Sequence, residues 1–167
     1  MIPEGLLVVL DTQVWIDIYL RLAILDPAQP YIAIFDALTD DEFVPVYSRP
    51  TFEELKRMLT ASRDVARRYH IDPADAVEFI ESIFYGAGEF VEITSTLHVS
   101  SDVDDDMFVE TAIVASAHVL VAENRDLHEP AVRHLLHEHG IAVLYPKQFR
   151  TLLARRRASA LRPESSA

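Results

Sequence analysis

Apolar residues along this chain fall into short continuous runs, which are separated by segments with helical spacing. The run Leu6–Leu10 is uninterrupted and rich in branched residues, which is typical of a strand buried on both faces of a parallel sheet. After Asp11, apolar residues recur every three or four positions, so the pattern predicts a helix that ends before Pro27. We therefore expect Asp11 where a central strand ends and a helix begins.

Strand-like and helix-like segments alternate along the rest of the chain. Strands are predicted at residues 43–47, 90–94, 97–99, 119–123 and 141–145, and helices at residues 31–39, 48–69, 72–85, 102–117, 130–138 and from residue 146 onward. Pro45, inside the first of these strands, indicates an edge position or a strand end. The alternation predicts an α/β fold, a three-layer α/β/α sandwich around a parallel sheet. We expect one domain, residues 1–155, and a basic, disordered tail, residues 156–167.

The composition is that of a globular domain. Half of the 167 residues are hydrophobic, which is enough for a sizeable core and argues against disorder. No apolar run approaches the roughly 20 residues of a membrane-spanning helix, and the N-terminus lacks the features of a signal peptide. There is no cysteine, which excludes disulfides and thiolate metal sites. We therefore expect a cytoplasmic protein.

The charge is strongly negative but unevenly distributed. A net charge of −12 argues against a general nucleic-acid binder, because phosphate contacts need Lys and Arg. Basic residues gather at residues 56–68 and 147–162, whereas acidic residues concentrate at Asp102–Asp106. The basic stretches can be solvated helix faces, or they can contact a polyanion while the acidic cluster holds a metal ion.

Acidic and amide side chains recur where predicted strands end. Asp11, Asn124 and Asp126 follow strands, and Glu54 lies one turn inside the helix after the second strand. In a parallel sheet these ends point to one edge, so the oxygens can converge on a cleft. A helix dipole accounts for any single acid, but the cluster Asp102–Asp106 would repel itself without a cation. Oxygen ligands without cysteine indicate Mg²⁺ or Mn²⁺ rather than zinc.

Four motifs in order resemble one known family. They are LDTQVWI, SRPTFEELKRML, DVDDDMFVETA and VLVAENRDL, followed by the closing segment GIAVLYPKQFRTLL. Together they resemble the PIN-domain ribonucleases from residue 8 to about residue 153. The resemblance implies a PIN-like nuclease fold and a Mg²⁺- or Mn²⁺-dependent endoribonuclease that hydrolyses RNA phosphodiester bonds. It also implies the toxin component of a type II toxin–antitoxin pair.

The resemblance also implies roles for individual residues. The catalytic residues would be Asp11, Glu54, Asp105 and Asn124. Asp11 and Asp105 would be the primary metal ligands, with Glu54 and Asp126 contributing to the metal site. Glu54 would orient or deprotonate the attacking water, because hydrolysis of a phosphodiester needs an activated nucleophile.

The expected partners are RNA and protein. Lys56, Arg57 and residues near Arg155 are candidate phosphate contacts, unless they are only a solubilising surface. The resemblance implies a cognate antitoxin that wraps the protein and blocks the site, and a homodimer formed through the early helices. If exposed, Trp15, Tyr19 or Tyr31 would suit such contacts, and for Trp15 packing in the core is the alternative.

Two departures from the family pattern support an alternative function. Gln13 replaces the usual Asn, and Ala122-Glu123-Asn124 replaces the usual Thr or Ser, Gly and Asp. The loss of a hydroxyl and an acid weakens the case for metal and water positioning. The alternative is a PIN-fold protein-binding module with a weak or lost nuclease site.

Two other kinds of site fit the sequence poorly. A zinc site at His134 and His137 lacks the usual i, i+4 histidine pair with a distant acid, which favours solvated helix histidines. A phospho-acceptor receiver domain needs paired acids after the first strand and an acceptor Asp after the third. This chain has Asp11-Thr12 and Thr94-Ser95 at these places, so we reject that function.

Overall fold

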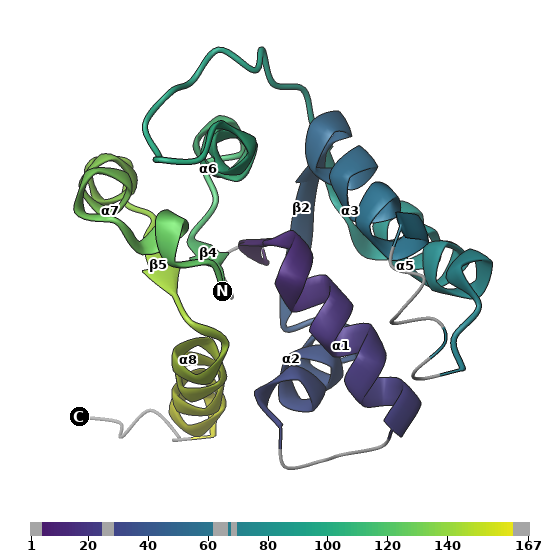
Figure 1. Ribbon diagram of the computed structural model, residues 1–167. Coiled ribbons are helices and arrows are strands. Elements are labelled where there is room, and N and C mark those ends of the chain that lie inside the picture. Colours follow the sequence, from purple (N-terminus) through teal and green to yellow (C-terminus); the bar gives the residue numbers. More distant parts are fainter. Residues whose placement is uncertain (1–4, 25–28, 62–66, 68–69, 162–167) are drawn as a thin grey trace.

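A five-stranded parallel sheet forms the centre of the protein (Figure 1). The computed structural model describes residues 5–24, 29–61, 67 and 70–161. The strand order is β3-β2-β1-β4-β5, and all four neighbouring pairs are parallel. The strands are β1 (Leu6–Leu10), β2 (Phe43–Ser48), β3 (Glu89–Val91), β4 (Val119–Val121) and β5 (Ala142–Leu144).

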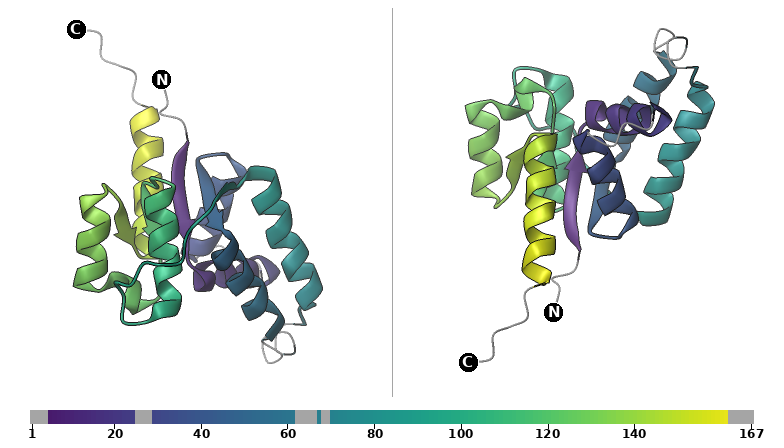
Figure 2. Two further views of the ribbon diagram at one scale, coloured as in Figure 1. Left: turned by 90° about the horizontal axis from the view of Figure 1, so that it is seen from above. Right: turned by 90° about the horizontal axis from the view of Figure 1, so that it is seen from below.

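Helices cover both faces of this sheet. Helices α6 and α7 lie on one side of the sheet, whereas α1, α2 and α8 lie on the other, as Figures 1 and 2 show. The predicted α/β class and three-layer arrangement are therefore confirmed. The helices are α1 (Thr12–Ile24), α2 (Pro30–Thr39), α3 (Arg49–Ala61), α5 (Pro73–Ala87), α6 (Asp106–Val114), α7 (Pro130–Glu138) and α8 (Pro146–Ala160), with short 3₁₀ turns η1 (Val103–Asp105) and η2 (Arg125–His128).

The apolar run of β1 is buried on both faces, as its sequence predicts. Leu6, Val8 and Leu10 belong to the hydrophobic cluster shared with α1, α2 and α8. Val9 points to the opposite cluster, with Phe108 of α6. Successive side chains of a strand alternate between faces, so a strand covered on both faces must be apolar throughout.

The strand β2 is not at an edge of the sheet. Its first half, Phe43–Pro45, pairs with β1, and its second half, Val46–Ser48, pairs with β3. The expectation of an edge strand or a strand end at Pro45 is therefore wrong. Pro45 lies just before the pairing with β3 begins, so a missing N–H group costs the sheet little at this point.

The predicted short strand at 97–99 is absent, because α6 satisfies the backbone there. The Leu97 N–H donates to Glu110 at 3.3 Å, and the Val99 N–H donates to Asp106 at 3.1 Å. Side-chain carboxylates replace the hydrogen bonds of a strand, and the segment is a loop. The preceding strand β3 also ends at Val91, earlier than the predicted residue 94.

Two predicted helix limits differ from the structure. The last helix, α8, continues to Ala160, past the expected domain limit at residue 155, and residues 162–167 of the expected tail lie outside the described part. The helix predicted at 48–69 is observed as α3 to Ala61, and most of the remainder lies outside the described residues. Among the helices described, none combines the length and apolar character needed to span a bilayer.

Two of the three aromatic residues expected on a contact surface belong to the interior. Trp15 is 3% exposed, and its ring packs edge-on against Phe84 with 5.0 Å between centroids. Tyr31 is 8% exposed, and its hydroxyl donates to the Glu123 carboxylate. Of the two alternatives for Trp15, core packing is therefore the one observed, whereas the expected exposure of Tyr31 to a partner is wrong. Tyr19 is partly buried and packs against Phe79 at 5.3 Å.

Candidate metal centre

The ends of β1 and β4 are joined by the side chain of Asp11. One carboxylate oxygen accepts the Val14 N–H at 2.9 Å, which caps the start of α1. The other accepts the N–H groups of Glu123 at 3.0 Å and Asn124 at 3.3 Å. Asp11 is therefore both a helix cap and a tie to the segment that follows β4.

The burial of Asp11 raises the pKa of its carboxyl group. The side chain is only 2% exposed, and desolvation raises its pKa to about 6, although the three N–H donors act in the opposite direction. Its oxygens are already engaged by backbone donors, so holding the site together is a well-supported role for this carboxylate.

Asn124 directs its amide towards the acidic turn. Its Nδ2 donates to Asp105 Oδ2 at 2.7 Å, and its Oδ1 accepts the Asp126 N–H at 3.1 Å. The second contact caps η2. Asn124 and Asp105, both assigned to the site from the sequence, are thus in direct contact. Asp126 is held beside Asn124 by its backbone N–H.

Three carboxylates come close enough to share one cation. Oxygens of Asp102, Asp105 and Asp126 all lie within 4.8 Å of one another. Asp102 and Asp105 come from η1 and its cap, and Asp126 comes from η2, so two segments distant in sequence supply the ligands. An all-oxygen set of this kind suits Mg²⁺ or Mn²⁺.

Two of these acids, Asp102 and Asp105, face a pocket of about 220 Å³ at the carboxyl ends of the central strands. Asp11 and Glu54 also face this pocket, although neither belongs to the three-acid group. We call it the acidic pocket. Its lining residues are Asp11, Thr12, Gln13, Glu54, Met58, Asp102, Asp104, Asp105, Phe108 and Asn124.

Two observations fit a bound cation in the acidic pocket. Burial raises the pKa of Asp105 to about 7, and repulsion from Asp102, Asp126, Asp11 and Asp104 acts in the same direction. This carboxyl group therefore lacks the positive charge that would stabilise its ionised form. Among the described residues, the buried hydroxyl of Thr12 has no hydrogen-bond partner, and Thr12 lines the same pocket.

Two further acids of α6 serve the preceding loop, residues 92–101, instead of the pocket. Asp106 Oδ1 accepts the N–H groups of Val99 at 3.1 Å and Ser100 at 2.7 Å. Glu110 accepts the N–H and hydroxyl of Thr94 at 2.8 and 2.7 Å, and these contacts lower its pKa against the effect of burial. The acidic run in the sequence is therefore divided between metal-type ligands and loop anchors.

The two basic residues of α3 that were expected to contact phosphate each pair with an acid of the same helix. Arg57 donates to the Glu54 carboxylate, and Lys56 lies 3.0 Å from Glu53 and 4.5 Å from the centre of the Phe52 ring. Arg57 is therefore held next to a residue that lines the acidic pocket, whereas Lys56 is paired outside it.

Arg155 lies away from these residues. Helix α8 begins after β5 and runs back alongside β1 (Figure 2), so its second half approaches the amino ends of the strands. Arg157, two residues after Arg155, donates to Glu42, which directly precedes β2. The structure therefore does not bring Arg155 together with Lys56 and Arg57.

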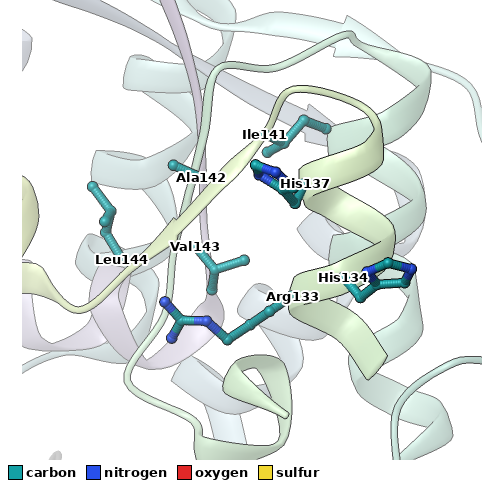
Figure 3. A pocket seen from close by; sticks show the side chains of 7 residues that line it. All are labelled: Arg133, His134, His137, Ile141, Ala142, Val143 and Leu144. Carbon is teal, nitrogen blue, oxygen red and sulfur yellow. The ribbon is translucent and has the colours of Figure 1, made fainter. Parts of the chain in front are cut away.

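The histidines of α7 form no metal cluster within the described residues. The groups of three or more potential ligands found there comprise only the three aspartates. Figure 3 shows the rings of His134 and His137 pointing in different directions beside the outer edge of β5. His134 instead lies 3.5 Å from Glu138, one turn along the same helix. His128 stacks on Tyr145 with 3.6 Å between the ring centres.

Sequence reasoning missed Asp102 as an individual ligand and Glu123 as a structural group. Asp102 was visible only as one member of the acidic run, and its cap of η1 through the Asp104 N–H was a usable signal. Glu123 binds Tyr31 across 92 positions of sequence, and no local pattern reveals such a contact.

A parallel α/β domain with carboxylates gathered at the carboxyl ends of its central strands has its candidate site where open α/β folds bind their ligands. The family model described as PIN domain matches residues 7–126. This match covers most of the chain, and the chain belongs to the PIN-domain family. PIN domains are generally nucleases that use divalent metal ions. No curated protein matches the sequence.

The raised pKa of Asp105 predicts a pH effect on the metal-free protein. Its native pKa of about 7 lies above the unfolded value, so the native state holds a proton that the unfolded state has lost. This contribution to stability is therefore lost as the pH rises from about 4 to about 7. Asp105→Asn carries no such proton, so its stability relative to wild type should rise across this range.

Urea unfolding in EDTA at a series of pH values measures this difference. Asp36→Asn makes the same change of charge at an exposed position on α2 and is the matched control. The same pH profile for Asp105→Asn as for this control would contradict the raised pKa.

Proposed function

We propose that this protein is a metal-dependent endoribonuclease that cuts RNA at the acidic pocket. The observation that carries this proposal is the approach of Asp102, Asp105 and Asp126 to within 4.8 Å in a PIN-family chain. The pocket lies at the carboxyl ends of parallel strands, where α/β folds bind their ligands.

Asp102, Asp105 and Asp126 are the proposed cation ligands. They would hold a Mg²⁺ or Mn²⁺ ion, whose chemistry would be to activate water and to offset charge on the scissile phosphate. Asn124 holds Asp105 through its 2.7 Å hydrogen bond, and Asp11 holds the backbone of Asn124. In this proposal Asp11 acts on the metal site through Asn124 and is not itself a ligand. This differs from its expected role as a primary ligand.

Glu54 is the proposed proton acceptor. It faces the acidic pocket from α3, outside the three-acid group, so its carboxylate can accept a proton from a water molecule without being a ligand. Its ion pair with Arg57 holds the carboxylate in place.

The proposed role in the cell is that of the toxin of a toxin–antitoxin pair. The resemblance of the ordered motifs and of the closing segment GIAVLYPKQFRTLL supports this role. A cognate antitoxin, a homodimer and action on RNA in the cytoplasm belong to the same proposal.

The alternative, a binding module without nuclease activity, has one observation in its favour. Both oxygens of Asp11 and the side-chain oxygen of Asn124 already accept backbone N–H groups, which is a sufficient structural reason for both residues. A binding module would tolerate loss of the metal ligands, whereas a nuclease would not.

Asp105→Asn tests the nuclease proposal. In wild type, Mn²⁺ should raise the melting temperature and support cleavage of single-stranded RNA, because an ion that binds only the native state stabilises it by about 2.7 kcal/mol at a hundredfold excess over its Kd. Asp105→Asn should lose both effects. Thermal melts and gel assays of labelled RNA measure them.

Asp36→Asn is the control for the change of charge, and it should behave like wild type. A wild-type protein with neither a Mn²⁺ shift nor cleavage would instead support the binding module. Cleavage of equal rate by Asp105→Asn would exclude the acidic pocket as the site.

Glu54→Gln separates metal binding from proton transfer. It should keep the Mn²⁺ shift but reduce kcat about 10²- to 10⁴-fold, because the amide cannot take a proton from water. Rates measured with saturating RNA and Mn²⁺ give this value. Glu53→Gln, at the next and exposed position of α3, should keep the wild-type kcat. Loss of the Mn²⁺ shift in Glu54→Gln would make Glu54 a ligand instead.

Expression in a bacterial host tests the toxin role. Wild type should arrest growth, and Asp105→Asn should not, because arrest by a nuclease toxin requires cleavage. Growth curves after induction, with immunoblots to match the protein levels, measure the difference. Normal growth with an enzyme that cuts RNA in vitro would argue against the toxin role without affecting the nuclease.

A further inference from the structure

A second, smaller cavity lies beside α3, at the same edge of the sheet as the acidic pocket. It has a volume of about 200 Å³ and is lined by Arg49, Pro50, Phe90, Glu92 and Ile93. Strand pairing explains its position, because Ser48 of β2 lies opposite Val91 of β3, and Arg49 and Glu92 directly follow this pair. We call this cavity the Phe90 slot.

The Phe90 slot combines an exposed aromatic ring with two polar side chains. Phe90 is 46% exposed, although its ring is supported from below by the buried Tyr47 at 5.6 Å between centroids. Arg49 and Glu92 are exposed, and neither forms an ion pair with any residue that the structure describes. The slot therefore offers an aromatic face, a guanidinium group and a carboxylate that are available to a ligand.

The size and chemistry of the slot suit one nucleobase. Its volume is below the roughly 300–1,000 Å³ of pockets for drug-sized ligands, so it suits a single planar ring system. Single-stranded RNA is recognised by bases that stack on aromatic rings and form hydrogen bonds along their Watson–Crick edges. Arg49 can contact the phosphate, whereas the carboxylate of Glu92 can only accept hydrogen bonds from the base.

The carboxylate of Glu92 discriminates between bases. The Watson–Crick edge of guanine presents two adjacent N–H donors, N1–H and N2–H, which match the two oxygens of a carboxylate. Adenine, cytosine and uracil each place an acceptor next to their donor, so the second oxygen would face a lone pair. The slot chemistry therefore favours guanine.

The Phe90 slot and the acidic pocket are neighbours on one face of α3. Pro50 lines the slot and Glu54 lines the acidic pocket, four residues apart in the helix. Residues four apart lie one above the other, with a rise of about 6 Å. One RNA strand can therefore contact both cavities.

We propose that the Phe90 slot binds one base of single-stranded RNA next to the phosphate that is cut, with a preference for guanine. This inference rests on the proposed nuclease function. Phe90 stacks on the base, Glu92 accepts its N1–H and N2–H, and Arg49 binds a neighbouring phosphate.

Binding of labelled RNA to the full chain tests the proposal. The probes are short oligouridines that carry one central guanosine, adenosine or cytidine, and fluorescence anisotropy in EDTA with Asp105→Asn prevents cleavage. The guanosine probe should bind about tenfold more tightly than the others. Adding Phe90→Ala should weaken its binding about tenfold, because stacking is lost, and adding Glu92→Gln should abolish the preference for guanosine.

Controls separate the slot from a loss of folding. Phe90→Trp should restore binding, and Tyr85→Ala, which removes another exposed ring outside the slot, should have no effect. Equal affinity for all probes, or equal binding by the Phe90→Ala and Tyr85→Ala variants, would overturn the proposal.

The result is also distinguishable from a failure of the nuclease proposal. RNA cleavage that depends on Mn²⁺ but is unchanged by Phe90→Ala and Glu92→Gln would overturn the slot and keep the nuclease. A guanosine preference that depends on Phe90 and Glu92 in a protein without metal-dependent cleavage would support the slot and overturn the nuclease.

Discussion

The buried carboxylate of Asp11 is the group on which the rest of the site depends. Its oxygens accept N–H groups from the first turn of α1 and from Glu123 and Asn124 in the segment after β4, and its own N–H donates to the Val121 carbonyl at 3.0 Å. A buried carboxylate is costly unless it is hydrogen-bonded, and these donors offset that cost. Asn124, fixed in this way, reaches Asp105. The acidic pocket thus takes its geometry from the paired strands β1 and β4.

The acidic run in α6 illustrates how one charged segment is divided between structure and chemistry. Asp106 and Glu110, one helical turn apart, satisfy the N–H groups of the loop 92–101. The contacts of Asp106 hold the end of this loop, directly before Asp102, which caps η1. Asp105 remains directed towards Asp126 and keeps a raised pKa of about 7. Neighbouring carboxylates that repel one another when no metal ion is bound are typical of a cation site.

Sequence patterns predicted the elements that depend on local or periodic features. The apolar run of β1 identified a strand covered on both faces. Asp11 and Asn124 were assigned to one site because parallel strands end at one edge, and the family resemblance singled out Asp105 within the acidic run. The loop 97–99 was mistaken for a strand, because its backbone partners are side chains of α6. The sequence left Trp15 open between the core and a partner surface, because its contact with Phe84 of α5 crosses distant sequence. Predictions failed where a long-range side-chain contact replaced a local pattern.

In the proposed nuclease, an RNA substrate would approach a protein of net charge −12, so the pairing of the basic residues on α3 matters. Lys56 and Arg57 are each paired with the acid three residues earlier on α3. Exposed ion pairs of this kind contribute only about 0–1 kcal/mol, so a phosphate can replace Glu53 beside Lys56 at little cost. The same exchange at Arg57 would release the carboxylate of Glu54 to a water molecule in the acidic pocket. In the proposed nuclease, substrate binding and activation of the proton acceptor would then be coupled through one ion pair on α3.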